Sequence, residues 1–428
     1  MGRLPAPVNT QSVVRDIPRL GRGKRGNLAE GDECDNMVRA SDRYRQTEER
    51  PMTSTTAPST SRVALAPLPA DYRADWEDIR IALLRLGEPA WVPFMEAGID
   101  ASHKRRILGR PVRTLADDLE VSRRLGRPFI VINIGLHTHP AVLEAMEVTH
   151  VEVENGRAGD TGWVHAGQRR WAQAGVGAIT SEEDFEKFPW PDADDFDYSL
   201  LDEADHLLPA NYRVIFTVGK VFNLGWWLMG FERYAFALAD NPGLVERLHE
   251  RIAAVQARVV ERALEHRCVG LIWHADDMAY RTGLMVSPAI LRRYIFPTYA
   301  RMNEMCRQQG VLTVFHSDGK MDDLMEDIIA AGFDAFNPIE PVAMDIRALK
   351  QRVQGRLSLI GNVDLSYTLT MGTPAEVEEE VRGLIRDLAP GGGYALASAN
   401  SIPEYVPWEN FVAMHAAWAR WGRYPIRV

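Results

Sequence analysis

Short apolar runs alternate with longer amphipathic segments along most of this chain. The runs are typical of buried β-strands, because they are brief and are bounded by turn residues. Seven of them are Phe129 to Ile134, Val214 to Val218, Val269 to Trp273, Val311 to Phe315, Ala335 to Phe336, Leu357 to Ile360 and Tyr394 to Ala397. One further candidate strand, Trp91 to Phe94, precedes them.

Between these runs, apolar residues recur three and four positions apart, which predicts amphipathic helices. The helices are expected at Leu244 to Leu264, Pro288 to Arg307, Met321 to Ala331, Asp345 to Arg352 and Pro374 to Leu388. Alternation of strands and helices favours a parallel sheet covered by helices. Eight strands match a closed barrel better than a doubly wound sheet. We therefore predict an α/β protein with a single (β/α)8 TIM barrel.

The N-terminal residues differ from the rest of the chain. The stretch Met52 to Arg62 is rich in Thr, Ser and Pro and has almost no large apolar side chain. Such a composition cannot offset the entropy lost on ordering. We predict a disordered N-terminal extension at 1–70 and a barrel domain at 71–428. An alternative interpretation makes Met52 the natural start of the protein.

Composition and charge narrow the set of partners. The 428 residues are 46% hydrophobic and 25% charged, which is ordinary for a globular protein. A formal net charge of -10 argues against a general surface for nucleic acid or anionic membranes. The 3 cysteines are far apart, so neither a disulfide framework nor a Cys-x-x-Cys zinc site is encoded. No apolar run reaches the roughly 20 residues of a membrane span, and we expect a cytoplasmic protein.

Polar residues follow consecutive predicted strands, where a barrel places its chemistry. The clusters are His274-Ala275-Asp276-Asp277, His316-Ser317-Asp318-Gly319, Asn337-Pro338-Ile339-Glu340, Gly361-Asn362-Val363-Asp364 and Ser398-Ala399-Asn400. Side chains two apart on extended backbone point the same way, so His316 and Asp318 are expected to face one ligand, metal or proton.

We predict that His316, Asp318 and Asp276 are the catalytic groups, because an imidazole and carboxylates supply acid-base chemistry or metal ligands. The residues expected to bind substrate are Trp227, Asp277, Asn337, Glu340, Asn362 and Asn400. Plainer interpretations stay open. Asn337 and Asn362 also fit turn chemistry, and the two adjacent aspartates also fit a helix cap or a solvated loop.

Several segments resemble the uroporphyrinogen decarboxylase superfamily, which also holds cobamide-dependent methyltransferases. The segments that carry the resemblance are Phe315-His316-Ser317-Asp318-Gly319, Gly361-Asn362-Val363-Asp364, Trp227 to Glu232 and Ile402 to Asn410. The resemblance extends from roughly residue 75 to the C-terminus. It implies a (β/α)8 barrel and an enzyme.

The sequence departs from both branches of that superfamily. The decarboxylases carry an Arg-Gln-Ala-Gly-Arg-Tyr element for substrate carboxylates, and here it reads Met95 to Asp100 without either arginine. The methyltransferases place zinc between a His-x-Cys pair and a later cysteine. Here the pair reads His316-Ser317-Asp318, and the later cysteine falls on Asn400. The resemblance then implies a metal site, with zinc as the candidate, at His316 and Asp318 together with Asp276 or Glu340. The loss of both thiolates moves the preference of that site toward harder, oxygen-ligated metals.

Three hypotheses follow. The first is methyl transfer to a small-molecule acceptor. The donor is either a corrinoid, free or carried by a partner protein, or a methylated small molecule. The second keeps uroporphyrinogen decarboxylation, with Arg105, Arg106 or Arg110 as the carboxylate clamp. The third is a barrel without catalysis that binds a tetrapyrrole or a corrinoid. If no metal is bound, His316 and Asp318 are expected to act as general base and orienting group.

Overall fold

The computed structural model describes residues 63–145, 148–152, 164–165, 168–172 and 177–428. The chain divides into two units, 1–61 and 62–428, and the second carries the barrel. Most of the predicted N-terminal extension therefore lies outside the described residues. Within 63–70, Leu65 and Leu68 pack against the core, and Trp408 Nε1 donates a hydrogen bond to Val63 O at 2.7 Å. These last residues of the predicted extension belong with the folded unit.

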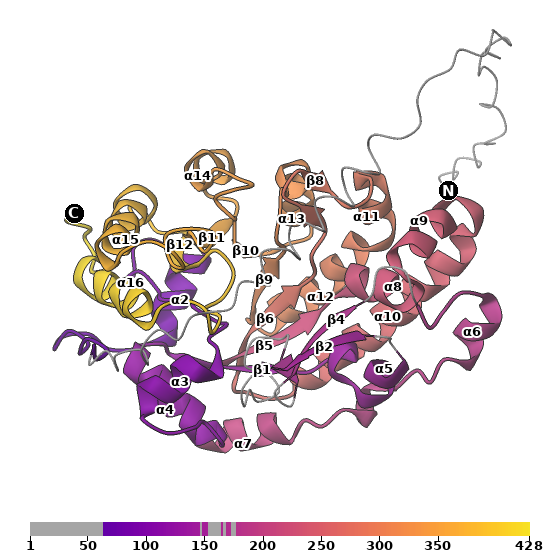
Figure 1. Ribbon diagram of the computed structural model, residues 1–428, viewed down its shortest axis with the longest axis horizontal. Helices are drawn as coiled ribbons and strands as arrows, with labels where there is room; N and C mark the ends of the chain where they lie inside the picture. Colours follow the sequence, from indigo (N-terminus) through magenta and orange to yellow (C-terminus); the bar gives the residue numbers. More distant parts are fainter. Residues whose placement is uncertain (1–62, 146–147, 153–163, 166–167, 173–176) are drawn as a thin grey trace, which may run out of the picture. The chain divides into compact units, whose positions relative to one another are not determined.

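Seven parallel strands form the central sheet in the order β1-β5-β6-β9-β10-β11-β12 (Figure 1). Their bounds are β1 (Phe129–Asn133), β5 (Arg213–Gly219), β6 (Val269–Ala275), β9 (Leu312–His316), β10 (Ala335–Asn337), β11 (Ser358–Val363) and β12 (Tyr394–Ser398). Each strand coincides with one of the seven apolar runs. The predicted α/β class and parallel barrel sheet are confirmed.

The eighth barrel position is taken by the segment around Trp91 to Met95, beside β12. Met95 N–H donates to Leu396 O at 2.8 Å, and Leu396 N–H donates to Pro93 O at 2.9 Å. The contacts are isolated bridges instead of a continuous ladder. Pro93 has no N–H to donate toward β12, which removes one hydrogen bond from the ladder on that side.

Helices pack on the outer side of the sheet. Contacts join α4 to β1, α10 to β5, α12 to β9, and α15 to β12. The helices of the second half are α10 (Pro242–Ala263), α11 (Pro288–Tyr294), α12 (Phe296–Gln308), α13 (Met325–Ala330), α14 (Ile346–Val353), α15 (Pro374–Leu388) and α16 (Trp408–Trp421). The predicted helix from Pro288 to Arg307 is two helices. Pro297 lacks the N–H that would continue the first helix, and the break falls at Ile295.

The remaining elements lie before β6 or in the loop that follows it. The helices are α2 (Trp76–Leu83), α3 (Ala101–Leu108), α4 (Leu115–Leu125), α5 (Pro140–Ala145), α6 (Glu182–Lys187), α7 (Ser199–Leu207), α8 (Val221–Met229) and α9 (Phe231–Asp240). A small antiparallel sheet has the order β2 (Val148–Glu152), β4 (Gln168–Ala172), β3 (Val164–His165), and a hairpin joins β7 (Ala279–Tyr280) to β8 (Gly283–Leu284). No described helix has both the length and the apolar composition of a membrane span.

Alternate residues of each strand belong to two different cores. The inner core holds Leu271 and Trp273 of β6 and Leu312 and Val314 of β9, whereas Phe315 belongs to the outer core under the helices. This two-residue period follows from the pleat of a strand. It also decides which polar residues at the strand ends face the barrel interior.

Helix α2 packs against the N-terminal ends of the strands, opposite the C-terminal ends where the polar residues lie. Its Trp76 and Leu83 belong to the inner core. Trp76 N–H donates to Asn211 O before β5, and Ser358 Oγ at the start of β11 donates to Leu83 O at 2.8 Å. With the N-terminal end covered, the C-terminal ends are left for polar chemistry.

Candidate active site

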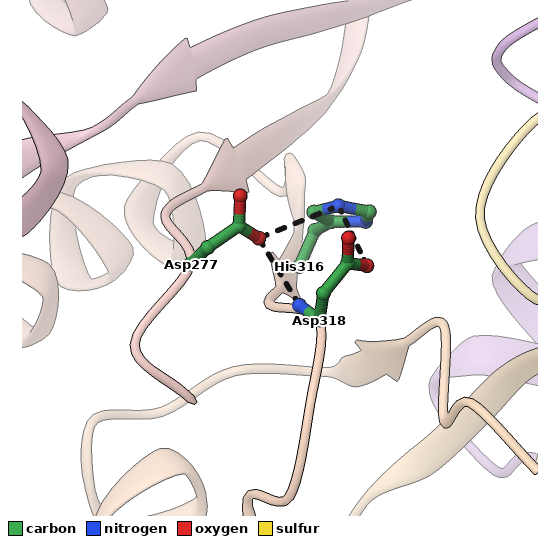
Figure 2. A group of neighbouring side chains, drawn as sticks. All are labelled: Asp277, His316 and Asp318. Atoms are coloured by element: carbon green, nitrogen blue, oxygen red, sulfur yellow. Dashed lines mark hydrogen bonds and ion pairs between the residues drawn. The ribbon is translucent and has the colours of Figure 1, made fainter. Parts of the chain in front are cut away.

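Three side chains from β6 and β9 converge at the C-terminal ends of the strands (Figure 2). His316 is the last residue of β9, Asp318 follows it in the loop, and Asp277 lies two residues after β6. His316 Nε2 is 4.0 Å from Asp277 Oδ1 and 3.8 Å from Asp318 Oδ1. Asp277 Oδ1 also accepts a hydrogen bond from the backbone N–H of Asp318 at 3.1 Å. We call Asp277, His316 and Asp318 the inner group.

Asn337 of β10 fixes the orientation of the His316 ring. His316 Nδ1 lies 2.6 Å from Asn337 Oδ1, and Asn337 Nδ2 donates to the carbonyl of Ile360 at 3.0 Å. Because the amide nitrogen must face that carbonyl, Oδ1 faces the ring and Nδ1 carries the proton. In neutral His316, Nε2 then carries no proton, and its lone pair points toward two carboxylates. Burial lowers the pKa of His316, while the Asp277 charge acts in the opposite direction.

Asp318 is held by Asn400, a residue that is expected from the sequence to bind substrate. Asn400 Nδ2 donates to Asp318 Oδ2 at 2.7 Å. Asp318 Oδ1 is enclosed and has no hydrogen-bond partner among the described residues. Burial, together with repulsion from Asp277 and Glu340, raises the pKa of Asp318 well above its ordinary value. This carboxyl group favours either a proton or a nearby cation.

The inner group fits a metal ion by the chemistry of its donors. One imidazole nitrogen and two carboxylate oxygens lie within 4.8 Å of one another. Three acceptors that face one another repel unless a proton or a cation lies between them. The outer nitrogen of His316 is hydrogen-bonded to Asn337, as is usual for metal-binding histidines. Nitrogen and oxygen donors of this kind suit zinc and harder divalent ions.

Glu340 and Asn362 shape the loops around the inner group. Glu340 Oε2 accepts from Gly319 N–H at 2.7 Å, just after Asp318. Gly319 has φ of 83°, and a Cβ there would meet Ala279 O at 2.5 Å, so only glycine fits. Asn362 Nδ2 donates to the backbone carbonyl that precedes Glu340 at 2.7 Å. Both residues support the loops, and their predicted contact with substrate stays a prediction.

Asp276 lies on the other side of β6, away from the inner group. Its carboxylate accepts from the N–H groups of Phe222 and Asn223, each at 2.8 Å, and from Tyr299 Oη at 2.6 Å. Burial raises its pKa to about 6. These contacts anchor the start of α8, which precedes Asp276 in the chain, whereas the cap that the sequence left open was on the helix that follows. The catalytic role predicted for Asp276 stays a prediction, and Asp277 occupies the place beside His316.

Two residues near this site were not singled out from the sequence. Lys220, directly after β5, is 4% exposed, and its Nζ lies 5.4 Å from the centroid of the half-buried Trp227 ring. His137, in the loop after β1, is buried, and its Nε2 lies 3.0 Å from Asn133 Oδ1. Burial and the Lys220 charge lower the pKa of His137. Both follow predicted strands, so the rule that selected His316 also applies to them.

The family model described as uroporphyrinogen decarboxylase (URO-D) matches residues 177–421. The chain belongs to this family. The matched region holds the strands β5 to β12 and the whole inner group, whereas the segment around Trp91 and β1 precede it. No curated protein matches the sequence.

A solved structure shows the same fold at low identity. A methyltransferase from Methanosarcina mazei is similar with a TM-score of 0.58 and 16% identity, over 81% of this chain and 99% of that chain. The IOLI protein with a bound zinc atom has a TM-score of 0.36 and 11% identity, over 72% of this chain and 92% of its own. The URO-D family assignment and the first of these structures agree on the fold of the barrel.

Proposed function

We propose that this URO-D family protein transfers a methyl group from a corrinoid donor to a small-molecule acceptor. The observation that carries the proposal is the inner group, three acceptors that converge where a barrel places its chemistry. The similarity of fold to a methyltransferase supports it. The missing arginines of the decarboxylase element favour it over decarboxylation.

A divalent metal, with zinc as the first candidate, would be held by Asp277, His316 and Asp318. When bound, it would lower the pKa of an acceptor thiol or hydroxyl and so favour the nucleophilic anion. Asn337 keeps His316 Nε2 turned inward, and Asn400 keeps Asp318 in place. These residues prepare the geometry before any ligand arrives.

If no metal is bound, His316 Nε2 instead offers a route for the acceptor's proton. In the overall reaction the acceptor loses a proton and gains the methyl group, while the bond between methyl and donor breaks. The proton passes to Nε2, which has its lone pair on the side of the two carboxylates. The nearby anionic carboxylates stabilise the imidazolium that results. Trp227 forms part of the wall beside this position.

Anaerobic incubation with methylcobalamin and a panel of small thiols, with zinc added, tests the proposal. The visible spectrum should change as the methyl group leaves cobalt, and the methylated thiol should appear by mass spectrometry. His316→Ala should abolish both signals, whereas Lys320→Ala, an exposed change in the same loop region, should keep them. No spectral change with any thiol or hydroxyl acceptor would contradict methyl transfer.

Decarboxylation of uroporphyrinogen is the second candidate, favoured by the family that the chain belongs to. The contacts of the described residues do not support the arginine clamp that this reaction needs for the substrate carboxylates. Glu96 is buried and accepts from Ser398 N–H at 2.7 Å, while Asp100 caps α3. Arg110 pairs with Asp117 at 2.5 Å, and Arg105 and Arg106 are exposed on α3. Incubation with uroporphyrinogen under reducing conditions, followed by chromatography for products with fewer carboxyls, decides between the two.

A further inference from the structure

Lys220 is a buried cation held next to the inner group. It follows β5 directly, and its backbone N–H donates to Ala275 O at 2.9 Å, two residues before Asp277. The side chain of Asn223, on the next turn, bonds to both the N–H and the carbonyl of Asp277, each at 2.9 Å. The start of α8 and the loop of Asp277 are thus joined by short hydrogen bonds, which fix the backbone of Lys220 beside that loop.

The backbone at Lys220 does not itself call for a lysine. Its φ is 60°, in the left-handed region that glycine and asparagine adopt most readily. Its carbonyl accepts from Leu224 N–H at 2.9 Å, the first bond of α8. Glycine would make the same turn with less strain. The contribution of Lys220 therefore lies in its side chain.

The charge of Lys220 acts on the residues of the inner group. Burial lowers its own pKa, while Asp277, Asp276 and Asp318 oppose that change. In return, the Lys220 charge lowers the pKa of Asp318 and of His316. Because Asp276 already accepts three hydrogen bonds, the carboxylates with capacity for a further cation are Asp277 and Asp318.

We propose that Lys220 is the resident counter-ion of the inner group and limits how tightly a divalent metal binds there. In the metal-free protein its ammonium group offsets the charge of Asp277 and Asp318. When a metal binds, the ammonium group is repelled by it and remains against the face of Trp227, whose ring attracts cations. The inference rests on the proposed metal site, and it makes Lys220 a residue that sets metal affinity.

Titration of the metal-free, full-length protein with Co²⁺, followed by visible absorption, tests the inference. Lys220→Met removes a positive charge near the metal and should raise Co²⁺ affinity about tenfold or more. Lys220→Arg keeps the charge and should keep the affinity of the unaltered protein. Lys320→Met, a matched exposed lysine that follows Gly319, should change affinity by less than about twofold.

Asp277→Asn separates failure of the inference from failure of the metal site. If Asp277→Asn weakens Co²⁺ binding but Lys220→Met leaves it unchanged, the metal site stands and the role of Lys220 is wrong. If neither the unaltered protein nor Lys220→Met binds Co²⁺, both are wrong. Binding by Lys220→Met alone would support the inference most strongly. Lys220→Gln, with thermal unfolding as a check, replaces Lys220→Met if that variant does not fold.

Discussion

The same three-residue pattern, His-x-Asp, occurs at the ends of two neighbouring strands and faces opposite sides of the barrel. His274-Ala275-Asp276 ends β6, and His316-Ser317-Asp318 ends β9. In the parallel register Ala275, not His274, pairs with His316. One pattern therefore starts a residue out of phase with the other, and the period of two sends its side chains to the other face.

The two faces give the same residue types different surroundings. His274 packs edge-on against Tyr299 and Phe333, and Asp276 accepts three hydrogen bonds from α8 and α12. On the inner side, Asp318 keeps an oxygen without a partner among the described residues. The outer pair is packed among the helices, and the ring nitrogens of His274 have no hydrogen-bond partner among the described residues, whereas the acceptors of the inner pair face a further carboxylate, Asp277.

Substitution of the two histidines should test the comparison most sharply. His316→Ala should lower the rate of methyl transfer at least about 10³-fold, because it removes a metal ligand or, in the metal-free protein, the proton acceptor. The folded protein should keep its stability, since His316 lies at the end of its strand. Stopped-flow spectroscopy with methylcobalamin measures the rate.

His274→Phe is the control for that measurement. It keeps a ring among Tyr299 and Phe333 and should leave the rate in the folded protein within about threefold. An equal loss of rate in both variants would contradict the assignment of His274 to the outer, structural side.

Asp276→Ala should give the next largest effect, on stability instead of rate. The substitution leaves two N–H groups of α8 and the hydroxyl of Tyr299 without their acceptor in a buried place. We expect the free energy of unfolding to fall by about 3 kcal/mol. Urea denaturation followed by circular dichroism measures it. Asp318→Ala, at the inner position, should change stability by less than about 1 kcal/mol, and a larger loss there would weaken the contrast.

The next largest effect is expected in the pH dependence of stability, to which the buried outer histidine, His274, contributes. Burial lowers the pKa of His274 to about 3, although the amide of Asn303 acts to raise it. As pH falls below about 6.5, the unfolded chain takes up the proton first, so stability is lost from there down to about pH 3. His274→Phe should remove about 2 kcal/mol of this loss at pH 5. Urea denaturation at pH 7 and pH 5 measures the difference, and Asp276 titrates in both proteins and cancels.

The apolar runs were enough to predict the sheet because strands buried on both faces read as continuous hydrophobic segments. Which face of the barrel each residue at a strand end occupies was not predicted. The run ending at Trp273 continues as strand through Ala275, so His274 lies within the strand and Asp276 is the first residue after it. The same period that puts His316 and Asp318 on one side selects Asp277 after β6.

Lys220 escaped prediction for another reason. The other candidates were selected as clusters of polar residues after a strand. Lys220 stands alone, because the apolar sequence of α8 starts directly after it. Only the fold places its charge beside Asp277. Single polar residues between a strand and an apolar helix are therefore informative when the fold is already indicated.

The smallest effect expected is at the amides that support each side. Asn400→Ala removes the donor to Asp318 Oδ2 and lets the pKa of Asp318 rise further, so a proton competes better with a metal. Co²⁺ affinity at pH 7 should fall about tenfold, which is the lower end for a residue that supports a metal ligand. Absorbance titration measures it.

Asn303 is the matched amide on the outer side. Its Nδ2 donates to Ala331 O at 2.9 Å, and its side chain raises the pKa of His274. Asn303→Ala should lower stability by about 1 kcal/mol and leave Co²⁺ affinity unchanged. Because both variants remove one buried amide, a loss of affinity in each would show that packing, not contact with Asp318, controls the metal. If only Asn400→Ala loses Co²⁺ affinity, two amides of the same type differ because they lie on different faces of the barrel. The face, not the residue type, then distinguishes the ligand-binding pair from the structural pair.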